Sequence, residues 1–414
     1  MIRLSPLSTG FAASKRKFFR STTNEDSYGS RSSTSCKKSR LSTSCTLFGS
    51  AFSPTQSGKT YLVACTSNGL ICVWDSTGAS TEPIIRVEAT AADKVLYDVQ
   101  FIESSGDTLL VVSGDPGILL YKWSAFLNAM DNLIDGNVVL EPIAKFKPHP
   151  SPSDAFGEPV EINCTSYSAV DNMLYGGAGD AFGCYQWDLR SEKLVGTFGG
   201  AGNNRCSGDY LHDVLSIPNN NHLVLTAGED GAITFWDGKE RKLIETMNVQ
   251  NTMNTNKQYV SWQVQNKGFG STQQWSSGSN LWVSSMDNKG DWLAAVGGSE
   301  SGNNMSLRSG PNTAGFMATW HLPTRTFNSG SVTRESYNAI TYNQNLDSFV
   351  SGGNNGRLTF WDSATGECTG RSGCTPSMIY TLSCNTVPSM IVAGGTGGSL
   401  DCFIDRVKAS NFTT

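Results

Sequence analysis

The feature that most constrains the fold of this chain is a short pattern that recurs between residues 46 and 406. Each copy has an apolar segment, a segment of small residues ending in Gly or Ala, a tight turn, and a segment ending in an aromatic residue, often as Trp-Asp. The clearest copies are residues 223–237, 348–362 and 61–75. A sheet this small cannot bury its two faces alone, so copies must pack against one another. The pattern therefore predicts an all-β ring of packed sheets.

Seven aromatic residues mark the copies and set the number of sheets. They are spaced 49, 64, 49, 84, 41 and 42 residues apart. The shortest spacings match the period of about 40–45 residues that is typical of WD40 repeats, and polar insertions account for the longer ones. We therefore predict a seven-bladed WD40 β-propeller over residues 46–406. Its blades end near Trp74, Trp123, Trp187, Trp236, Trp320, Trp361 and Phe403.

A tight turn precedes the last strand of the clearest copies. In a two-residue hairpin turn both central residues need a positive φ, which Asn, Asp and Gly adopt most readily. We predict such turns at Asp230-Gly231, Asn68-Gly69 and Asn355-Gly356.

The copy at residues 223–237 also suggests a hydrogen-bond network that stabilises the repeat. Trp236 can donate its indole N–H to the hydroxyl of Thr226 on the paired strand, and the Asp230 carboxylate can accept neighbouring backbone N–H groups. Trp361 and Trp74 hold the same place in their own copies. We expect these five residues to form the structural network of the repeat.

Three insertions and the two chain ends leave the regular pattern. We expect residues 124–158 to begin with one or two helical turns at 124–130. Residues 248–281 and 299–314 are expected to be exposed loops, although the first contains Trp262 and Trp275 and could instead bind a partner. The last blade needs a fourth strand, which either the C-terminal segment 407–414 or residues before Thr46 could supply.

Composition excludes several other classes of protein. The chain has 414 residues, 38% hydrophobic and 16% charged, with 43 Gly, which fits neither a disordered chain nor a helical bundle. No apolar run reaches the 18–20 residues or so that a membrane helix needs. The 11 Cys lack any CxxC pair and there are only 4 His, so we expect reduced thiols, no metal and no cofactor.

Charge divides the chain into a basic tail and an acidic body. Residues 1–45 hold nine basic residues and two acidic ones, about +7, which leaves about −12 for the rest of a chain of net charge −5. We expect a disordered, Ser/Thr-rich tail and a folded body that does not bind nucleic acid by itself. The tail could serve as a nuclear import signal or nucleic-acid contact, as an organelle transit peptide, or simply as a solvated end. The candidate import residues are Lys15, Arg16, Lys17, Lys37, Lys38 and Arg40.

Several short segments resemble one family of WD40 proteins, the sixth subunit of the THO complex. The resemblance covers about residues 46–406, and Trp123 with its short helical segment agrees with it. The segments that carry it are Pro159–Asn163, Gly208–His212, Gly228–Gly231 and Trp320–Leu322.

This resemblance implies a nuclear, non-enzymatic scaffold. The THO complex belongs to the transcription–export assembly (TREX) that packages nascent mRNA, and its sixth subunit docks on subunits that are largely helical and coiled-coil. We therefore expect other THO subunits as partners, an RNA contact that is indirect or made by the tail, no membrane contact, and location in the nucleus rather than the cytoplasm.

A second resemblance rests on one tetrapeptide. Trp187-Asp188-Leu189-Arg190 looks like the Trp-Asp-x-Arg box with which some propellers bind the adaptor of cullin-four ubiquitin ligases, and residues 236–239 are a poorer copy. The resemblance implies that Asp188 and Arg190 pair with charges on that adaptor. The alternative function is therefore that of a substrate receptor of a cullin-four RING ligase, and the competing interpretation is that Trp-Asp simply ends a blade.

We find no pattern that favours an enzyme. Asp98, Glu161 and Asp213 lie near predicted blade starts and could face the central channel, but we interpret them as surface or capping carboxylates. The glycines of residues 394–398 are not followed by Lys-Ser/Thr, so we predict a hairpin turn there rather than a phosphate loop. His212 is expected to be a structural residue.

Overall fold

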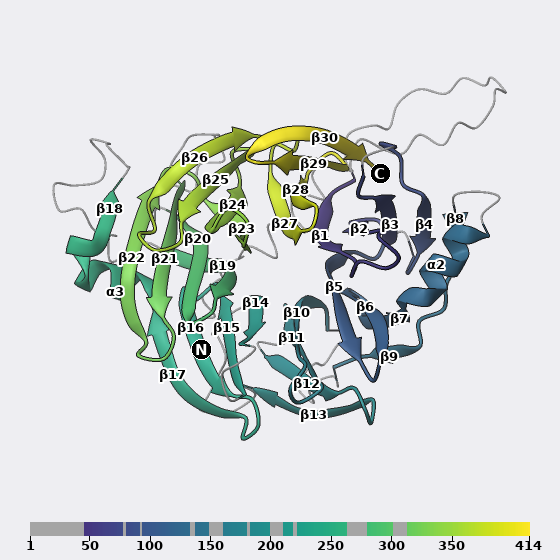
Figure 1. Cartoon of the computed structure of the whole chain (residues 1–414). Helices are drawn as coiled ribbons and strands as arrows, with labels where there is room; N and C mark the ends of the chain where they lie inside the picture. Colours follow the sequence, from purple (N-terminus) through teal and green to yellow (C-terminus); the bar gives the residue numbers. More distant parts are fainter. Residues whose placement is uncertain are drawn as a thin grey trace, which may run out of the picture.

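Seven β-sheets stand around a central channel like the blades of a propeller (Figure 1). The computed structural model describes residues 45–77, 80–91, 93–132, 137–148, 160–179, 183–198, 210–217, 222–262, 280–300 and 313–414. The six candidate import residues and most of the predicted tail lie outside these ranges. The predicted seven-bladed propeller is confirmed. In every blade the strands are in chain order from the channel to the rim, apart from two added edge strands.

Between the third and fourth strands of the second blade, the chain adds a strand to the first blade. The first comprises β1 (Leu47–Phe52), β2 (Tyr61–Thr66), β3 (Leu70–Asp75) and β4 (Ile85–Glu88). The second comprises β5 (Leu96–Ser104), β6 (Asp107–Gly114), β7 (Gly117–Lys122) and β9 (Ala144–Phe146). Between β7 and β9 the chain forms α2 (Trp123–Asp131) and then β8 (Asn137–Val138), which pairs in parallel with β4 as a fifth strand of the first blade.

The third and fourth blades are regular four-stranded sheets. The third comprises β10 (Ile162–Ser168), β11 (Met173–Ala178), β12 (Cys184–Asp188) and β13 (Lys193–Phe198). The fourth comprises β14 (Leu211–Ser216), β15 (Leu223–Gly228), β16 (Ala232–Asp237) and β17 (Lys242–Asn248). Their outer strands β13 and β17 lie at the rim of the propeller (Figure 1).

The fifth blade carries the second added strand. Its four regular strands are β19 (Asn280–Lys289), β20 (Trp292–Glu300), β21 (Thr313–His321) and β22 (Thr326–Thr333). The segment before them forms α3 (Val249–Thr255), a 3-10 turn η1 (Lys257–Tyr259) and β18 (Val260–Trp262), which pairs in parallel with β22. The expectation of an exposed loop over 248–281 is therefore wrong for residues 249–262, because Val249 and Met253 are fully buried. The expected loop 299–314 is likewise wrong at both ends, since Ser299 lies in β20 and Ala314 in β21, and both are buried.

The sixth and seventh blades end the chain. The sixth comprises β23 (Tyr337–Asn343), β24 (Ser348–Gly353), β25 (Arg357–Asp362) and β26 (Cys368–Gly373). The seventh comprises β27 (Ile379–Thr386), β28 (Ser389–Gly395), β29 (Ser399–Ile404) and β30 (Val407–Thr413). The C-terminal segment thus supplies the fourth strand of the last blade, and the Gly-rich residues 394–398 form the turn between β28 and β29.

Among the described residues, the ring closes without an exchange of strands between the first and last blades. Trp74 of the first blade has Ala64, which carries no hydroxyl, ten positions before it, and its indole instead donates to the backbone carbonyl of Thr413 on β30 (3.2 Å). The backbone N–H of Thr413 donates in turn to the carbonyl of Thr81 (2.9 Å). The closure therefore depends on packing and hydrogen bonds across one seam.

The second blade departs from the predicted marker residue. In the other six blades the marker aromatic is the second-last residue of the third strand, as Trp236 is in β16. In the second blade that place belongs to Tyr121, which pairs with Leu110. Trp123 instead begins α2, where its ring stacks on Phe126 (5.3 Å between centroids). The helix itself was predicted, and it is confirmed.

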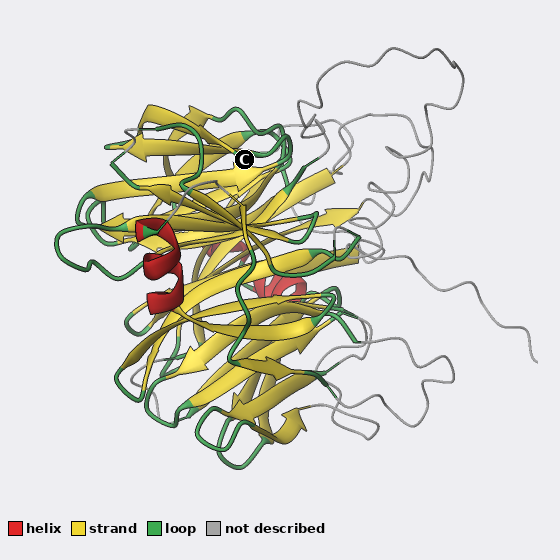
Figure 2. Cartoon of the chain, turned by 90° about the vertical axis from the view of Figure 1, so that its right-hand side faces the viewer, coloured by secondary structure: helices red, strands yellow, loops and turns green. Residues whose placement is uncertain are grey.

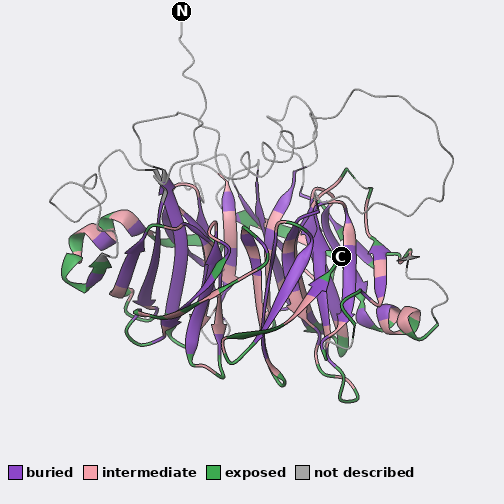
Figure 3. Cartoon of the chain, turned by 90° about the horizontal axis from the view of Figure 1, so that it is seen from above, coloured by how far each residue is buried: buried purple, intermediate pink, exposed green. Residues whose placement is uncertain are grey.

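Strands predominate in the described part of the chain (Figure 2), and the helices α2 and α3 lie at the outside of the ring (Figure 1). Buried side chains run through the middle of each blade, and exposed ones gather at the turns (Figure 3). The six largest buried side chains are all tryptophans that sit at or beside the ends of third strands. Apolar packing between neighbouring sheets is therefore the main source of stability.

Candidate functional site

The innermost strand of each blade contains a β-bulge at the same place. Its register against the second strand shifts by one residue in all seven blades. The skipped residue, here called the inner bulge residue, lines a cavity of about 180 Å³ in the channel. A bulge re-aims a side chain out of the regular alternation, which explains how one position per blade faces the channel. The inner bulge residues are Phe48, Tyr97, Asn163, His212, Ser284, Asn338 and Tyr380.

Polar inner bulge residues connect neighbouring blades. Three of them donate a side-chain hydrogen bond to the backbone carbonyl of the residue that precedes the bulge of the next blade. These bonds run from Asn163 to Leu211 (3.2 Å), from Ser284 to Tyr337 (2.6 Å) and from Asn338 to Ile379 (3.0 Å). On this side of the cavity the side chains therefore hold neighbouring blades together.

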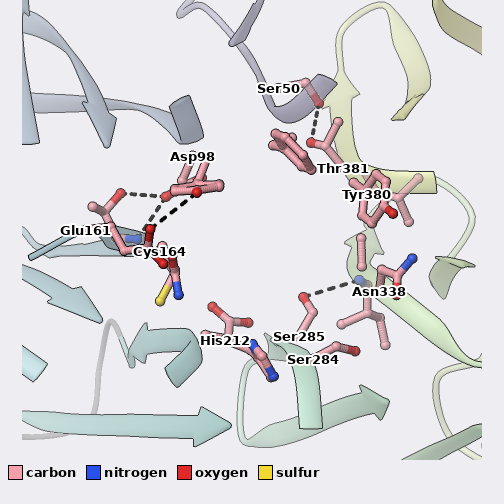
Figure 4. A pocket seen from close by; sticks show the side chains of 18 residues that line it. Ser50, Asp98, Glu161, Cys164, His212, Ser284, Ser285, Asn338, Tyr380 and Thr381 are labelled. Carbon is pink, nitrogen blue, oxygen red and sulfur yellow. Dashed lines mark hydrogen bonds between the residues drawn. The ribbon is translucent and has the colours of Figure 1, made fainter. Parts of the chain in front are cut away.

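Aromatic inner bulge residues occupy the other side, at the seam of the ring. Phe48 lies between Tyr97 and Tyr380, with ring centroids 5.7 Å and 5.2 Å away. The Tyr97 hydroxyl lies 3.4 Å from a carboxylate oxygen of Glu161, which is 3% exposed. Figure 4 shows Glu161 beside Asp98 at one side of the cavity and Tyr380 across from them.

Aspartates of the inner strands bridge blades by accepting backbone N–H groups. Asp98 and Asp213 line the cavity, so the interpretation of these two residues as surface carboxylates is wrong. Their bonds to backbone N–H groups agree with the other interpretation, that of capping carboxylates. Asp287 does the same one blade later. Their acceptor bonds are Thr165 N to Asp98 (2.9 Å), Met286 N to Asp213 (2.5 Å) and Tyr342 N to Asp287 (2.6 Å).

Burial changes the acidity of two of these aspartates. Desolvation raises the pKa of Asp213 to about 8, against the lowering effect of its backbone hydrogen bonds. Desolvation also raises the pKa of Asp287. Perturbed pKa values accompany functional sites and structural networks alike. Here the backbone bonds between blades explain why the carboxyl groups are there.

The predicted repeat network exists wherever the sequence supplies a hydroxyl. Trp236 Nε1 donates to Thr226 Oγ1 (2.9 Å), and Trp361 Nε1 donates to Ser351 Oγ (2.8 Å). Asp230 accepts the backbone N–H of Ala232 (3.0 Å).

The turns in these copies differ from the predicted two-residue type. Only their glycines have a positive φ, whereas Asn68, Asp230 and Asn355 do not. The Gly231 N–H donates to the Gly228 carbonyl (3.3 Å). This is a type I turn followed by a left-handed glycine, so the loop has three residues.

The carboxylate of Asp188, in the possible adaptor box, makes hydrogen bonds within its own turn. Its two carboxylate oxygens accept the backbone N–H of Arg190 and the hydroxyl of Ser191, both at 2.9 Å. These bonds lower the pKa of Asp188. Equivalent turn bonds to the carboxylate occur at Asp75, Asp237 and Asp362. The Arg190 side chain is exposed.

The described residues offer little for metal binding, thiol chemistry or insertion into a membrane. Among those residues, no cluster of His, Cys, Asp or Glu could hold a metal ion. The nine described cysteines are free, and burial raises the pKa of thiols such as Cys65 and Cys164, which disfavours reactive thiolates. Within the described ranges, no helix has the length and apolar character needed to cross a bilayer.

A second set of bulges lies at the rim. In blades three to seven the fourth strand skips one residue beside the marker aromatic; we call it the outer bulge residue. The five are Val195, Ile244, Asn328, Thr369 and Ala409.

Two neighbouring outer bulges expose apolar side chains. Val195 is 40% exposed and Ile244 43%, next to Leu243 at 38%. Arg241, in the turn before β17, lies over Gly196 of β13, so this turn of the fourth blade contacts the outer strand of the third. We call Val195, Leu243 and Ile244 the blade 3–4 rim. Sequence reasoning missed it, since its residues are typical of any strand.

Comparison with known proteins gives one informative match. No protein-family model matches the chain. The chain is 23% identical over 374 residues to a protein of Danio rerio described as THO complex subunit 6 homolog, covering 86% of this chain and 93% of that protein. The chain is a seven-bladed β-propeller protein similar to THO complex subunit 6 homolog.

Proposed function

We propose that this protein is a non-enzymatic scaffold subunit of a THO-like complex, which supports mRNA processing and nuclear export from the nucleus. The similarity to THO complex subunit 6 homolog along 86% of the chain is the observation that carries this proposal. The site geometry agrees with it, because the channel carboxylates and polar bulge residues are used in bonds between blades.

The blade 3–4 rim is the surface that we propose for docking on the other subunits. Its three apolar side chains are about 40% exposed on the outer strands of adjacent blades, and a partner surface can bury them. Blades one and five cannot offer the same surface, since β8 and β18 cover their outer strands. A helical or coiled-coil partner would bury Val195, Leu243 and Ile244 against its own apolar stripe.

The test is purification of the tagged full-length protein from nuclear extract of the cells that make it. We expect the other THO subunits to co-purify in comparable amounts, together with RNA that ribonuclease treatment removes without releasing them. Recovery of the tagged protein without any other THO subunit would refute the proposal.

The cullin-ligase alternative gains no support from the geometry of residues 187–190. Asp188 makes the same kind of turn bonds as Asp75, Asp237 and Asp362, so the Trp-Asp pair is explained by its place at the end of a strand. We therefore propose no second function.

A further inference from the structure

The seventh blade carries apolar residues at one end, where other blades carry polar ones. Its third strand, β29, ends in Ile404, which pairs with Val407 on β30 across a two-residue turn. Asp405 and Arg406 both have a positive φ, as a type I′ turn requires, so this turn needs no capping carboxylate. The third strands of four other blades end instead in an aspartate that bonds to the following turn: Asp75, Asp188, Asp237 and Asp362.

Three aliphatic side chains are exposed at this end of the blade. Val387 is 74% exposed, Val407 69% and Ile404 43%. Val387 lies in the turn between β27 and β28, which is at the same end of the sheet as the β29–β30 turn, because neighbouring strands are antiparallel. Strands are about 4.8 Å apart, so the three side chains lie within about 15 Å of one another across the sheet. We call these three residues the blade 7 tip.

The charge beside the blade 7 tip is negative. The exposed carboxylate of Asp405 has no hydrogen-bond or ion-pair partner in the described part of the chain. The two basic neighbours are engaged elsewhere. Arg406 lies over the ring of Phe360 (5.1 Å to the centroid), and Lys408 pairs with the buried Asp401 (2.8 Å). The tip therefore favours an apolar segment that carries positive charge.

The area of the blade 7 tip limits what can cover it. Three aliphatic side chains supply only a fraction of the roughly 800 Å² per partner that a stable interface buries. That is too little for a second copy of the chain or for another folded domain. A segment of the same chain needs less area, because a linker of suitable length holds it at a high effective concentration, about millimolar for short linkers.

The chain contains a segment of matching chemistry before the first strand. Residues 15–20 read Lys-Arg-Lys-Phe-Phe-Arg and combine four positive charges with two aromatic side chains. They lie outside the described ranges, which begin at Cys45, and 24 residues separate the segment from it. Cys45 lies beside Gly398, in the β28–β29 turn of the seventh blade.

The linker is long enough for the segment to reach the tip. A chain of 24 residues spans at most about 80 Å. The longest strand of the seventh blade, β27, has 8 residues, which corresponds to about 27 Å from one end of the blade to the other. The segment can therefore pass from the end of the blade near Cys45 to the opposite end.

We propose that residues 15–20 dock on the blade 7 tip of the same chain. Phe18 and Phe19 cover the three aliphatic side chains, and a basic residue of the segment pairs with Asp405. Residues 15–17 are candidate import residues, so the docked state limits their access to an import receptor. This inference concerns a different surface from the blade 3–4 rim and does not depend on membership of a THO-like complex.

Photo-crosslinking of the full-length protein tests the proposal. Phe18 is replaced by p-benzoylphenylalanine, the purified protein is irradiated at low concentration, and crosslinked peptides of the monomer are identified by mass spectrometry. We expect most crosslinks to join residue 18 to peptides that contain Val387, Ile404 or Val407. Crosslinks spread over several blades, crosslinks to the blade 3–4 rim, or crosslinks formed only between two chains would overturn the proposal.

Matched variants locate the contact. Val387→Lys should lower the yield of crosslinks at the tip at least about fivefold, because an apolar contact is replaced by a charge of the same sign as the segment. Val170→Lys is the control and should leave the yield unchanged, since Val170 is also 74% exposed and lies in the corresponding turn of the third blade.

A third variant tests the charge. Asp405→Asn should lower the same yield about two- to fivefold, as expected for an exposed ion pair. Equal yields from the Val387 and Val170 variants, or from Asp405→Asn and the wild type, would contradict the assignment. Unfolding temperatures confirm that each variant is folded.

Discussion

The outer strands of the third and fourth blades differ from those of the fifth and sixth at one backbone position that all four share. At this outer bulge, Asn328 donates to Thr319 Oγ1 (3.2 Å) and to the Ala364 carbonyl (3.1 Å), and Thr369 donates to the Phe360 carbonyl (3.3 Å). Val195 and Ile244 occupy the same position with half-exposed apolar groups.

The comparison shows how one backbone irregularity can serve two purposes. A polar residue at the bulge makes bonds within the propeller, including one to the neighbouring blade, and so adds to stability. An apolar side chain at the same position makes no hydrogen bond and stays partly exposed to water, so a partner protein can bury it. Similar strands can therefore differ in function without any change of fold.

The largest expected effect comes from making the rim polar. Val195→Lys with Ile244→Lys should lower recovery of the other THO subunits at least about tenfold, because charged groups cannot be buried at an apolar contact. The matched control is Thr369→Lys with Ala409→Lys, which changes outer bulges of blades six and seven and should leave recovery unchanged. Equal recovery with the two double variants would remove the functional difference between the rims.

The next prediction tests how much the outer bulge residues contribute to the free energy of unfolding. Asn328→Ala should lower the free energy of unfolding by about 1–2 kcal/mol, since both of its side-chain hydrogen bonds are lost. Ile244→Asn should change it by less than about 1 kcal/mol, because the side chain is 43% exposed. Urea unfolding of the purified variants measures both. A larger loss for Ile244→Asn would show that the rim is structural.

The next prediction concerns the pH dependence of stability, which Asp213 on the inner strand β14 should affect. The folded state raises the pKa of Asp213 to about 8, so between about pH 4 and 8 it binds more protons than the unfolded chain does. This group therefore makes the protein less stable as pH rises through that window. Asp213→Asn should gain stability relative to the wild type between pH 5 and pH 8.

Urea unfolding at pH 5 and pH 8 measures this change. The control is Asp107→Asn, which removes a carboxylate at the rim, where the Asp107 side chain is 54% exposed. A constant difference between Asp213→Asn and the wild type would mean that the Asp213 carboxyl is not perturbed by burial.

The smallest effect is expected from the end of the chain. All strands of the seven blades lie between Leu47 and Thr413. Deleting residues 1–40 should therefore move the unfolding temperature by no more than about 2 °C. Scanning calorimetry measures it, and a drop of many degrees would show that this segment stabilises the ring.

The sequence predicted the ring because the marker aromatics recur with a period, and it predicted the Trp236–Thr226 bond because both residue types are specific. It could not predict the bulges, since a one-residue shift of register leaves no trace in composition. It placed the second marker at Trp123 instead of Tyr121 because most of the other copies end in Trp, whereas Trp123 begins α2. Residues 249–262 were assigned to a loop because polar composition concealed the buried Val249 and Met253.

The channel was only partly predictable. Asp98, Glu161 and Asp213 could be placed near blade starts, but their shared cavity arises from seven strands spread over the chain. The aromatic arc of Phe48, Tyr97 and Tyr380 joins residues more than 330 positions apart in one case, so only ring closure brings them together.

The closure without strand exchange has a consequence for biosynthesis. The Trp74 indole finds its acceptor at Thr413 on β30, so the first blade to leave the ribosome must await the last strand of the seventh blade. Until that strand has been synthesised, the nascent propeller is an open arc whose terminal sheets each expose one unmatched face. Such an arc is a natural client for chaperones, and joining the two ends by a linker while cutting elsewhere would shift that waiting period to another pair of blades.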